Sequence, residues 1–170
     1  MTASVRAEPI GTERLELLPL RVEHADEMAL VLSDPALHTF IGGVPETAPE
    51  LRARYARMVA GSPEPEVVWC NWVIRLRAEG CLAGTVQATV RGAEAEVAWM
   101  VGTPWQGRGI ATEAALSMLR DLETRGVRSF VAHIAPGHAA SAAVATALGL
   151  APTEVWNDGE IRWRRPGTER

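Results

Sequence analysis

One fifteen-residue segment, residues 99–113, constrains the fold more than any other part of the chain. Its apolar run ends at a Gly-Thr-Pro break, and Gly107 and Gly109 flank an arginine just before a helical pattern begins. This order aims several unbonded backbone N–H groups at the positive end of a helix. Helix N-termini of this kind bind phosphate groups. The segment therefore predicts a strand, a turn and a helix that together hold a phosphorylated ligand.

The length and composition of the chain favour a single soluble domain. A chain of 170 residues can bury a core that is stable without disulfides or metal ions, and 47% hydrophobic with 22% charged residues is ordinary for a globular protein. No apolar run is long enough to span a bilayer, and residues 1–9 lack the apolar core of a signal peptide. We therefore expect a cytoplasmic protein without a membrane partner.

Charge and ligand-type residues exclude further classes of function. The net charge of −4 argues against non-specific nucleic-acid binding, and all 17 basic residues are arginine, so no lysine chemistry is available. The four histidines form no i,i+4 pair, which predicts that there is no metal site. Cys70 and Cys81 lie in strand-like segments, and we expect small apolar residues there rather than a disulfide.

Hydrophobic periodicity and turn residues divide the chain into alternating elements. Strands are predicted at residues 14–20, 67–77, 81–90, 94–101, 129–135, 154–157 and 160–164, and helices at 22–32, from 49, at 108–125 and at 139–148. Gly84 is expected to mark a β-bulge, and Asp158-Gly159 is a strong hairpin signal.

The resulting order, β-α-α-β-β-β-α-β-α-β-β, predicts the α+β class. The sheet is expected to be mostly antiparallel, with one parallel pair joined by a right-handed crossover between residues 94 and 135. Residues 12–165 are expected to form one domain, with residues 1–11 and 166–170 as loose ends.

Two familiar phosphate-binding motifs do not fit the glycine turn. The segment lacks the Gly-Lys-Ser/Thr ending of a P-loop, and Thr112 stands where the dinucleotide fingerprint needs its third glycine. Taken by itself, the hexapeptide at residues 107–112 is also compatible with glycines that only shape a turn.

The segment Gln106-Gly107-Arg108-Gly109-Ile110-Ala111 matches the Gln/Arg-x-x-Gly-x-Gly/Ala signature of the GCN5-related N-acetyltransferases, and the element order resembles that fold over nearly the whole chain. Two stretches are similar to the ribosomal-protein-alanine-acetyltransferase (RimJ/RimL-type) branch. They are Thr12-Glu13-Arg14-Leu15-Glu16-Leu17 and Ala111-Thr112-Glu113-Ala114.

This resemblance implies a splayed parallel pair and a reaction: acetyl-CoA donates its acetyl group to a primary amine by direct attack through a tetrahedral intermediate. The acceptor is a protein N-terminus or a small-molecule amine. The pyrophosphate is expected on the turn and the pantetheine arm on the strand before it. The residues expected to hold the coenzyme are Met100, Val101, Gln106, Gly107, Arg108, Gly109, Ile110, Ala111, Thr112, His138 and Ser141.

The chemistry calls for a proton acceptor, because only about one alkyl amine in a thousand is neutral at pH 7. Period-two alternation puts Glu94 and Glu96 on one face of their strand, where they are candidate bases acting through water, with Glu96 nearer the reactive end. A solvated sheet face is the alternative. A backbone N–H near Met100 or Val101 is expected to stabilise the thioester oxygen.

The proton donor is less clearly indicated, because the sequence departs from the family pattern. Many relatives use a tyrosine on the last helix, whereas Tyr55 falls on the second one. His138 replaces the usual asparagine, and Ser141 keeps the family serine and is the candidate donor to the sulfur; both are also compatible with a structural role at the start of the helix. These departures leave a non-catalytic acyl-CoA-binding module as the alternative function, and a homodimer stays open.

The loop at residues 40–49 and several tryptophans are expected to shape the acceptor pocket.

Overall fold

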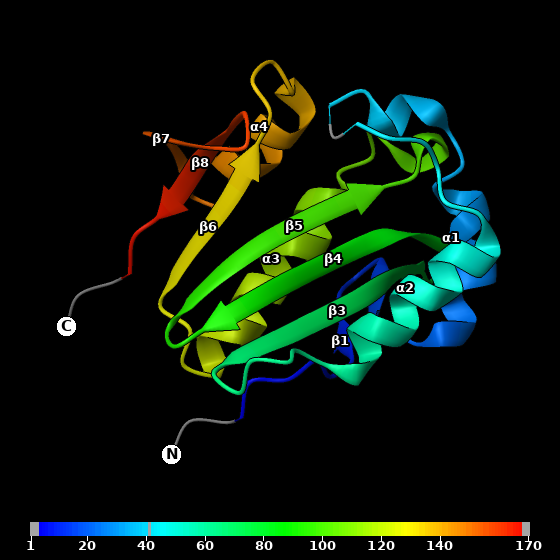
Figure 1. The fold of residues 1–170 in the computed structure, drawn as a ribbon, viewed down its shortest axis with the longest axis horizontal. Coiled ribbons are helices and arrows are strands. Elements are labelled where there is room, and N and C mark those ends of the chain that lie inside the picture. Colours follow the sequence, from blue (N-terminus) through cyan, green and yellow to red (C-terminus); the bar gives the residue numbers. More distant parts are fainter. Residues whose placement is uncertain (1–3, 41, 168–170) are drawn as a thin grey trace.

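The computed structural model describes residues 4–40 and 42–167 and contains an eight-stranded sheet in the order β1-β2-β3-β4-β5-β6-β8-β7 (Figure 1). Only β5 and β6 pair in parallel among the described strands. The α+β class, the element order and the single parallel pair are confirmed. The strands are β1 (Ile10–Gly11), β2 (Leu15–Pro19), β3 (Val67–Leu76), β4 (Leu82–Arg91), β5 (Glu94–Val101), β6 (Ser129–Ile134), β7 (Ala151–Asn157) and β8 (Glu160–Arg165).

The helices cover both faces of this sheet. In Figure 1, α1 and α2 lie in front of β3 and β4, whereas α3 lies behind the sheet and α4 follows β6. Short 3-10 helices occupy Val22–His24, Pro35–His38 and Thr103–Trp105. The α-helices are α1 (Ala25–Val31), α2 (Ala48–Ala60), α3 (Ile110–Thr124) and α4 (Ala139–Ala147).

Two hydrophobic clusters hold the layers together, and β3 contributes to both. Trp72 and Ile74 pack into the cluster behind the sheet, whereas Val73 packs with Tyr55 and Leu51 in front. The side chains of a strand point to alternate faces, so a strand covered on both sides reads as a continuous apolar run. The apolar face of α3 is buried against the rear face of the sheet.

The parallel pair is short, and this shortness shapes the molecule. β5 and β6 pair only from Glu94–Ser129 to Glu96–Val131, after which the two strands diverge (Figure 1). On its other side, β5 lies tightly on β4: a Cβ at Gly84 would come 2.2 Å from the Met100 carbonyl oxygen. The β3–β4 register shifts opposite Gly84, where the sequence predicts a bulge. Glycine therefore fixes the position of the diverging end of β5.

Part of the N-terminal segment expected to be loose contacts the sheet. Ile10 and Gly11 pair with β2, and the Trp72 indole N–H donates to the Glu8 carbonyl at 2.8 Å. Residues 1–3 and 168–170 of the expected loose ends lie outside the described residues. The domain limits stay a prediction.

Two further observations concern the described residues. None of the helices within residues 4–40 and 42–167 has both the length and the apolar character required to cross a bilayer. Cys70 and Cys81 are free thiols, and burial raises the pKa of Cys70 to about 11.

Candidate active site

Two cavities meet along the end of β5. One, the β5–β6 cavity, has a volume of about 530 Å³ and opens where the parallel strands diverge. The other, the α2 cavity, has a volume of about 360 Å³ and lies between α2 and the front face of β3, β4 and β5. Both are lined by Ala98, Trp99 and Met100. A group bound in one cavity can therefore reach a group bound in the other across these three residues.

The β5–β6 cavity is walled by β5, β6, the turn before α3 and the start of α4. After Glu96, no strand among the described residues pairs with this edge of β5. Unpaired strand edges bind extended chains through their backbone N–H and C=O groups. The edge that includes Met100 and Val101 is thus suited to an amide-containing chain such as pantetheine.

The glycine turn supplies unbonded backbone N–H groups to the same cavity. Gly107 and Gly109 have φ angles of 77° and 76°, which L-residues with a Cβ rarely adopt. Gln106 N–H donates to Thr103 and Glu113 N–H to Gly109, but the six intervening N–H groups have no acceptor among the described residues. Such a nest at a helix N-terminus fits a pyrophosphate.

The side chains of Gln106 and Arg108 in the turn bind other parts of the protein. The Gln106 amide donates to the Val101 carbonyl at 3.0 Å and so fastens the turn to the end of β5. The Arg108 guanidinium points away and pairs with Glu79 at 2.7 Å, and Arg108 does not line the cavity. The Arg108 side chain is thus placed away from a ligand in the turn.

His138 and Ser141 stand together at the start of α4. Ser141 N–H donates to His138 Nδ1 at 3.4 Å, so the imidazole caps the helix as an asparagine would. Ser141 Oγ lies 3.2 Å from His138 Nε2, and the ring stacks on Phe40 at 4.3 Å. Burial lowers the pKa of His138, which favours the neutral ring that a cap requires. All three side chains line the β5–β6 cavity.

Glu113 links the first turn of α3 to the N-terminal strands. Its carboxylate accepts hydrogen bonds from the Thr12 hydroxyl at 2.5 Å and from Arg14 Nε at 2.7 Å. Burial raises the pKa of Glu113, but these hydrogen bonds outweigh it and hold the pKa below its usual range. Arg14 also donates to the Arg108 carbonyl at 2.8 Å. This brace fixes the helix end on which the turn depends.

The structure separates the two candidate bases. Glu94 lies where β5 and β6 are still paired, accepts a hydrogen bond from Ser129 at 3.2 Å and lines neither cavity. Glu96 lines the β5–β6 cavity, is 55% exposed, and has Oε1 at 3.5 Å from His133 Nδ1. Its side chain is on the same strand face as Ala98 and Met100.

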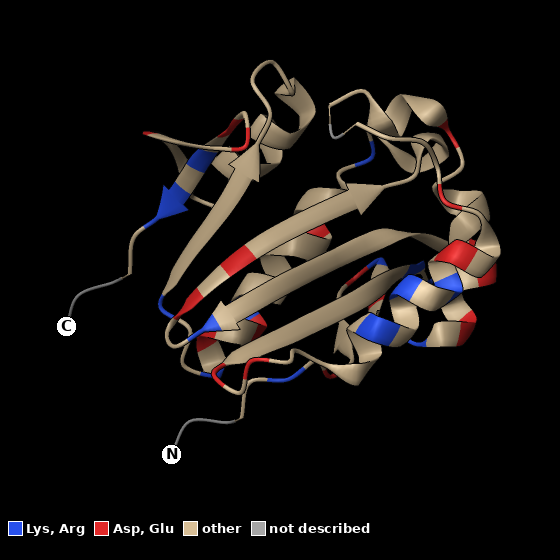
Figure 2. Cartoon of the chain, in the orientation of Figure 1, with Lys and Arg blue, Asp and Glu red and all other residues tan. Residues whose placement is uncertain are grey.

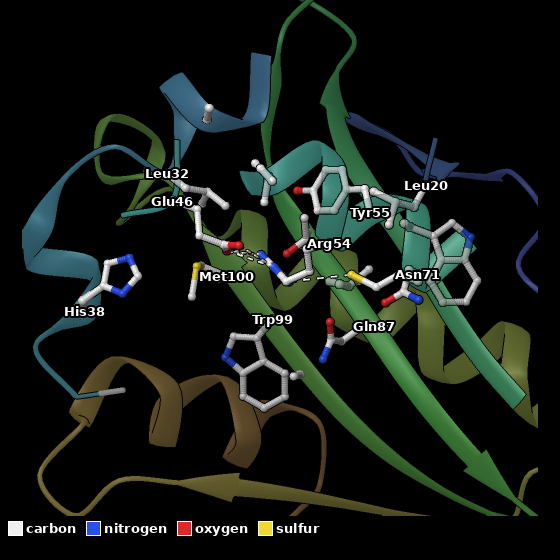
Figure 3. A pocket seen from close by; sticks show the side chains of 17 residues that line it. Leu20, Leu32, His38, Glu46, Arg54, Tyr55, Asn71, Gln87, Trp99 and Met100 are labelled. Atoms are coloured by element: carbon white, nitrogen blue, oxygen red, sulfur yellow. Dashed lines mark hydrogen bonds and ion pairs between the residues drawn. The ribbon is translucent and has the colours of Figure 1, made fainter. Parts of the chain in front are cut away.

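The α2 cavity is built from side chains of many elements (Figure 3). Trp99 and Met100 lie at one end, and Tyr55 and Asn71 at the other, with Gln87 on the floor. The Tyr55 hydroxyl is buried and has no hydrogen-bond partner in the described part of the chain. Burial raises the pKa of Tyr55 to about 12, so its hydroxyl stays neutral at physiological pH. Because Tyr55 does not line the β5–β6 cavity, it is not placed to protonate a group bound there.

Charge is distributed unevenly around the two cavities. Figure 2 shows coloured residues on α2, on β8 and at the start of β5, whereas the ends of β4, β5 and β6 near the cavities are uncoloured. The loop expected to shape an acceptor pocket contributes to both cavities, with Glu46 in one and Phe40 in the other. In the part of the chain that is described, no three His, Cys, Asp or Glu side chains gather as they would around a metal ion.

Sequence reasoning missed several lining residues. His133 reads as a core residue of a buried strand, yet it lies beside Glu96, and its Nε2 is buried without a partner among the described residues. Tyr55, Asn71 and Gln87 carry no motif. Only the face assignment of their elements by periodicity could have indicated them.

The comparisons with known proteins agree with this geometry. The family model described as "Acetyltransferase (GNAT) domain" matches residues 14–151. A search of the curated proteins finds no match.

Several solved structures are similar over nearly the whole chain. An acetyltransferase of the GNAT family from Bacillus anthracis has 16% identity and a TM-score of 0.77, covering 94% of this chain and 98% of that one. The ribosomal L7/L12 alpha-N-protein acetyltransferase RimL in complex with coenzyme A has 16% identity and a TM-score of 0.76, covering 94% and 98%. The microcin C7 self-immunity acetyltransferase MccE in complex with acetyl-CoA and AMP has 14% identity and a TM-score of 0.74, covering 91% and 93%. These likenesses show the fold.

Proposed function

Because the chain belongs to the acetyltransferase (GNAT) domain family, a family of acetyl-CoA-dependent N-acetyltransferases, we propose that it acetylates a primary amine by direct attack on acetyl-CoA. The acceptor is a protein N-terminus or a small-molecule amine. The names of three similar structures refer to ribosomal-protein acetyltransferases, which supports a peptide N-terminus as one acceptor. The observation that carries the proposal is the meeting of two cavities along Ala98, Trp99 and Met100.

The β5–β6 cavity is the proposed coenzyme site. The backbone N–H groups of residues 107–112 hold the pyrophosphate, and Gln106 keeps the turn fastened to β5. The free edge of β5 at Met100 and Val101 pairs with the pantetheine amides. A backbone N–H of this edge stabilises the negative charge that develops on the thioester oxygen. When bound, acetyl-CoA supplies an activated acyl group on a good leaving thiolate.

The amine enters from the α2 cavity and must lose a proton to attack. Glu96 is the proposed base rather than Glu94, because only Glu96 lines the cavity. Ala98 and Met100 follow Glu96 on the same face, and four residues along a strand span about 13 Å, so the proton travels through water. His133 beside the carboxylate keeps it oriented toward the opening.

The departing thiolate needs a proton donor on the opposite side. Ser141 lines the β5–β6 cavity, and its hydroxyl contacts a histidine ring, so it is the proposed donor. His138 holds the hydroxyl and caps α4 at the same time. Tyr55 has no part in this step because it lines the α2 cavity only.

Thiol release from acetyl-CoA in the presence of a panel of amines and peptides tests the proposal. We expect release that depends on the amine, together with binding of acetyl-CoA measured by titration calorimetry. Binding without release on any acceptor would favour a non-catalytic acyl-CoA-binding module. Absence of acetyl-CoA binding would refute both functions.

A further inference from the structure

The α2 cavity has an unusual balance of charge for an amine-binding site. Among the described side chains that line it, Glu46 and Arg54 are the only Asp, Glu, Lys or Arg residues. They neutralise one another, because Arg54 Nε donates to both Glu46 oxygens at 2.8 and 3.1 Å, and the second guanidinium nitrogen lies 2.8 Å from Oε1. Each charge is thus already compensated by the other, so a charged ligand would have to compete with this pair. The imidazole Nδ1 of His38, which also lines the cavity, lies 3.1 Å from the Gly42 carbonyl oxygen.

Neutral hydrogen-bonding groups, by contrast, are left available. Tyr55 is 1% exposed, and its hydroxyl has no hydrogen-bond partner among the described residues. The side-chain amides of Asn71 and Gln87 make no hydrogen bond to any described residue, although both line the cavity. A buried polar group without a partner is costly, so a ligand that satisfies the Tyr55 hydroxyl is favoured. Asn71 is half-buried and Gln87 is exposed, so their amides are open to a ligand that enters the cavity.

Sheet register sets the spacing of these groups from the reaction centre. Gln87 pairs with Ala98 across β4 and β5, and Asn71 pairs with Gln87 across β3 and β4. Neighbouring strands are about 4.8 Å apart, which places the backbones of Gln87 and Asn71 about 5 and about 10 Å from that of Ala98. Apolar residues line the remaining wall, Leu20, Leu51 and Met58 among them.

We propose that the acceptor is a primary amine with no second charge, whose apolar body carries neutral amide or hydroxyl groups that bind Gln87, Asn71 and Tyr55. The Glu46–Arg54 pair enforces this choice because it leaves no counter-ion for a carboxylate or for a second ammonium group. The inference rests on the proposed function and names its acceptor class. It applies equally to a peptide N-terminus with uncharged residues and to a small amino-amide.

Two pairs of probes test this selectivity. Leucinamide and leucine are alike in size but differ by a carboxylate, and butylamine and 1,4-diaminobutane differ by a second ammonium group. In thiol-release assays, we expect kcat/KM to be at least about tenfold higher for leucinamide than for leucine, and for butylamine than for 1,4-diaminobutane. Equal values within either pair would overturn the proposal.

Opposite variants of the ion pair should shift selectivity in opposite directions. Glu46→Gln frees a cation, so leucine should gain about tenfold on leucinamide; Arg54→Gln frees an anion, so 1,4-diaminobutane should gain about tenfold on butylamine. Asp26→Asn is the matched control, because it breaks the ion pair that Asp26 of α1 forms with Arg52 of α2, outside the cavity. A shift of the same sign in both variants, or one as large in the control, would contradict the proposal.

Tyr55→Phe examines the neutral contact separately. Removal of the hydroxyl should raise KM for leucinamide about two- to tenfold and leave that for butylamine unchanged. Titration calorimetry of the coenzyme-A-loaded protein distinguishes this inference from the proposed function. Preferential binding of leucinamide over leucine without any thiol release would uphold the acceptor class and refute acetyl transfer. Thiol release with leucine and leucinamide alike would uphold transfer and refute the acceptor class.

Discussion

The two cavities that meet at β5 differ in the groups that they offer to a ligand. The β5–β6 cavity offers mainly backbone: a free strand edge, two left-handed glycines and the unbonded N–H groups of a helix start. The α2 cavity offers side chains from α1, α2, three strands and two loops. A backbone site needs only a short local sequence, whereas a side-chain site needs the whole fold. The same scaffold can therefore keep one donor site while the acceptor site changes.

The largest expected effect concerns Glu96. It tests whether this side chain, which lines the coenzyme cavity, accepts the proton of the amine rather than binding the coenzyme. Glu96→Gln should lower kcat on the order of 100- to 1,000-fold, because general base catalysis contributes this much, and should remove the acidic limb of the pH–rate profile. Acetyl-CoA affinity measured by calorimetry should not change. An unaltered pH–rate profile would eliminate Glu96 as the base, and a large loss of affinity would break the division between the two cavities.

A second prediction examines the backbone site directly. Gly107→Ala should weaken acetyl-CoA binding about 30- to 100-fold. A residue with a Cβ is strained at this positive φ, and relief of the strain shifts the backbone N–H groups away from the pyrophosphate. Gly92→Ala is a matched control. Both glycines have positive φ, 77° and 61°, and no atom lies within 4 Å of either added Cβ. We expect both variants to lose the same thermal stability and only Gly107→Ala to lose affinity for acetyl-CoA. Equal affinities in the two variants would show that the pyrophosphate does not bind at this turn.

This division also explains what could be predicted from the sequence. The strand, turn and helix at residues 94–124 depend on local periodicity and on glycine, and their prediction is confirmed by the elements observed. Glu113 lies in the first turn of this helix, but its partner Thr12 lies 101 residues away in the chain. No periodicity encodes such a contact. The direction of Arg108 toward Glu79 and the approach of His133 to Glu96 depend in the same way on how distant strands align.

A third, smaller effect concerns the side chain that caps α4 beside the backbone site. Folding favours the neutral His138 ring, so as the pH falls the unfolded chain takes up the proton first. The stability that the cap contributes is therefore present above the ordinary histidine pKa of about 6.5 and is lost as the pH falls below it. His138→Asn keeps a cap that does not titrate, and N-caps contribute about 1 kcal/mol.

Thermal unfolding of the wild-type protein and of His138→Asn between pH 7.5 and pH 5 measures this contribution. The quantity compared at each pH is the difference between their free energies of unfolding. The wild-type protein should lose about 1 kcal/mol more than His138→Asn on acidification. Parallel curves would show that the ring does not act as a titrating cap.

The smallest expected effect concerns Arg108, the charged residue inside the glycine signature. It is the most direct test of whether the coenzyme site is built from backbone rather than from side chains. If the pyrophosphate site is built from backbone, Arg108→Gln should change acetyl-CoA affinity less than about twofold, since the guanidinium is half-exposed and pairs with Glu79 outside the cavity. Glu79→Gln removes the partner of Arg108 and leaves its charge in place, and it should be equally silent. Calorimetry at low and high salt measures both variants. A tenfold loss in Arg108→Gln alone would mean that the guanidinium turns from Glu79 to the phosphate when the coenzyme binds, and that the donor site depends on a side chain after all.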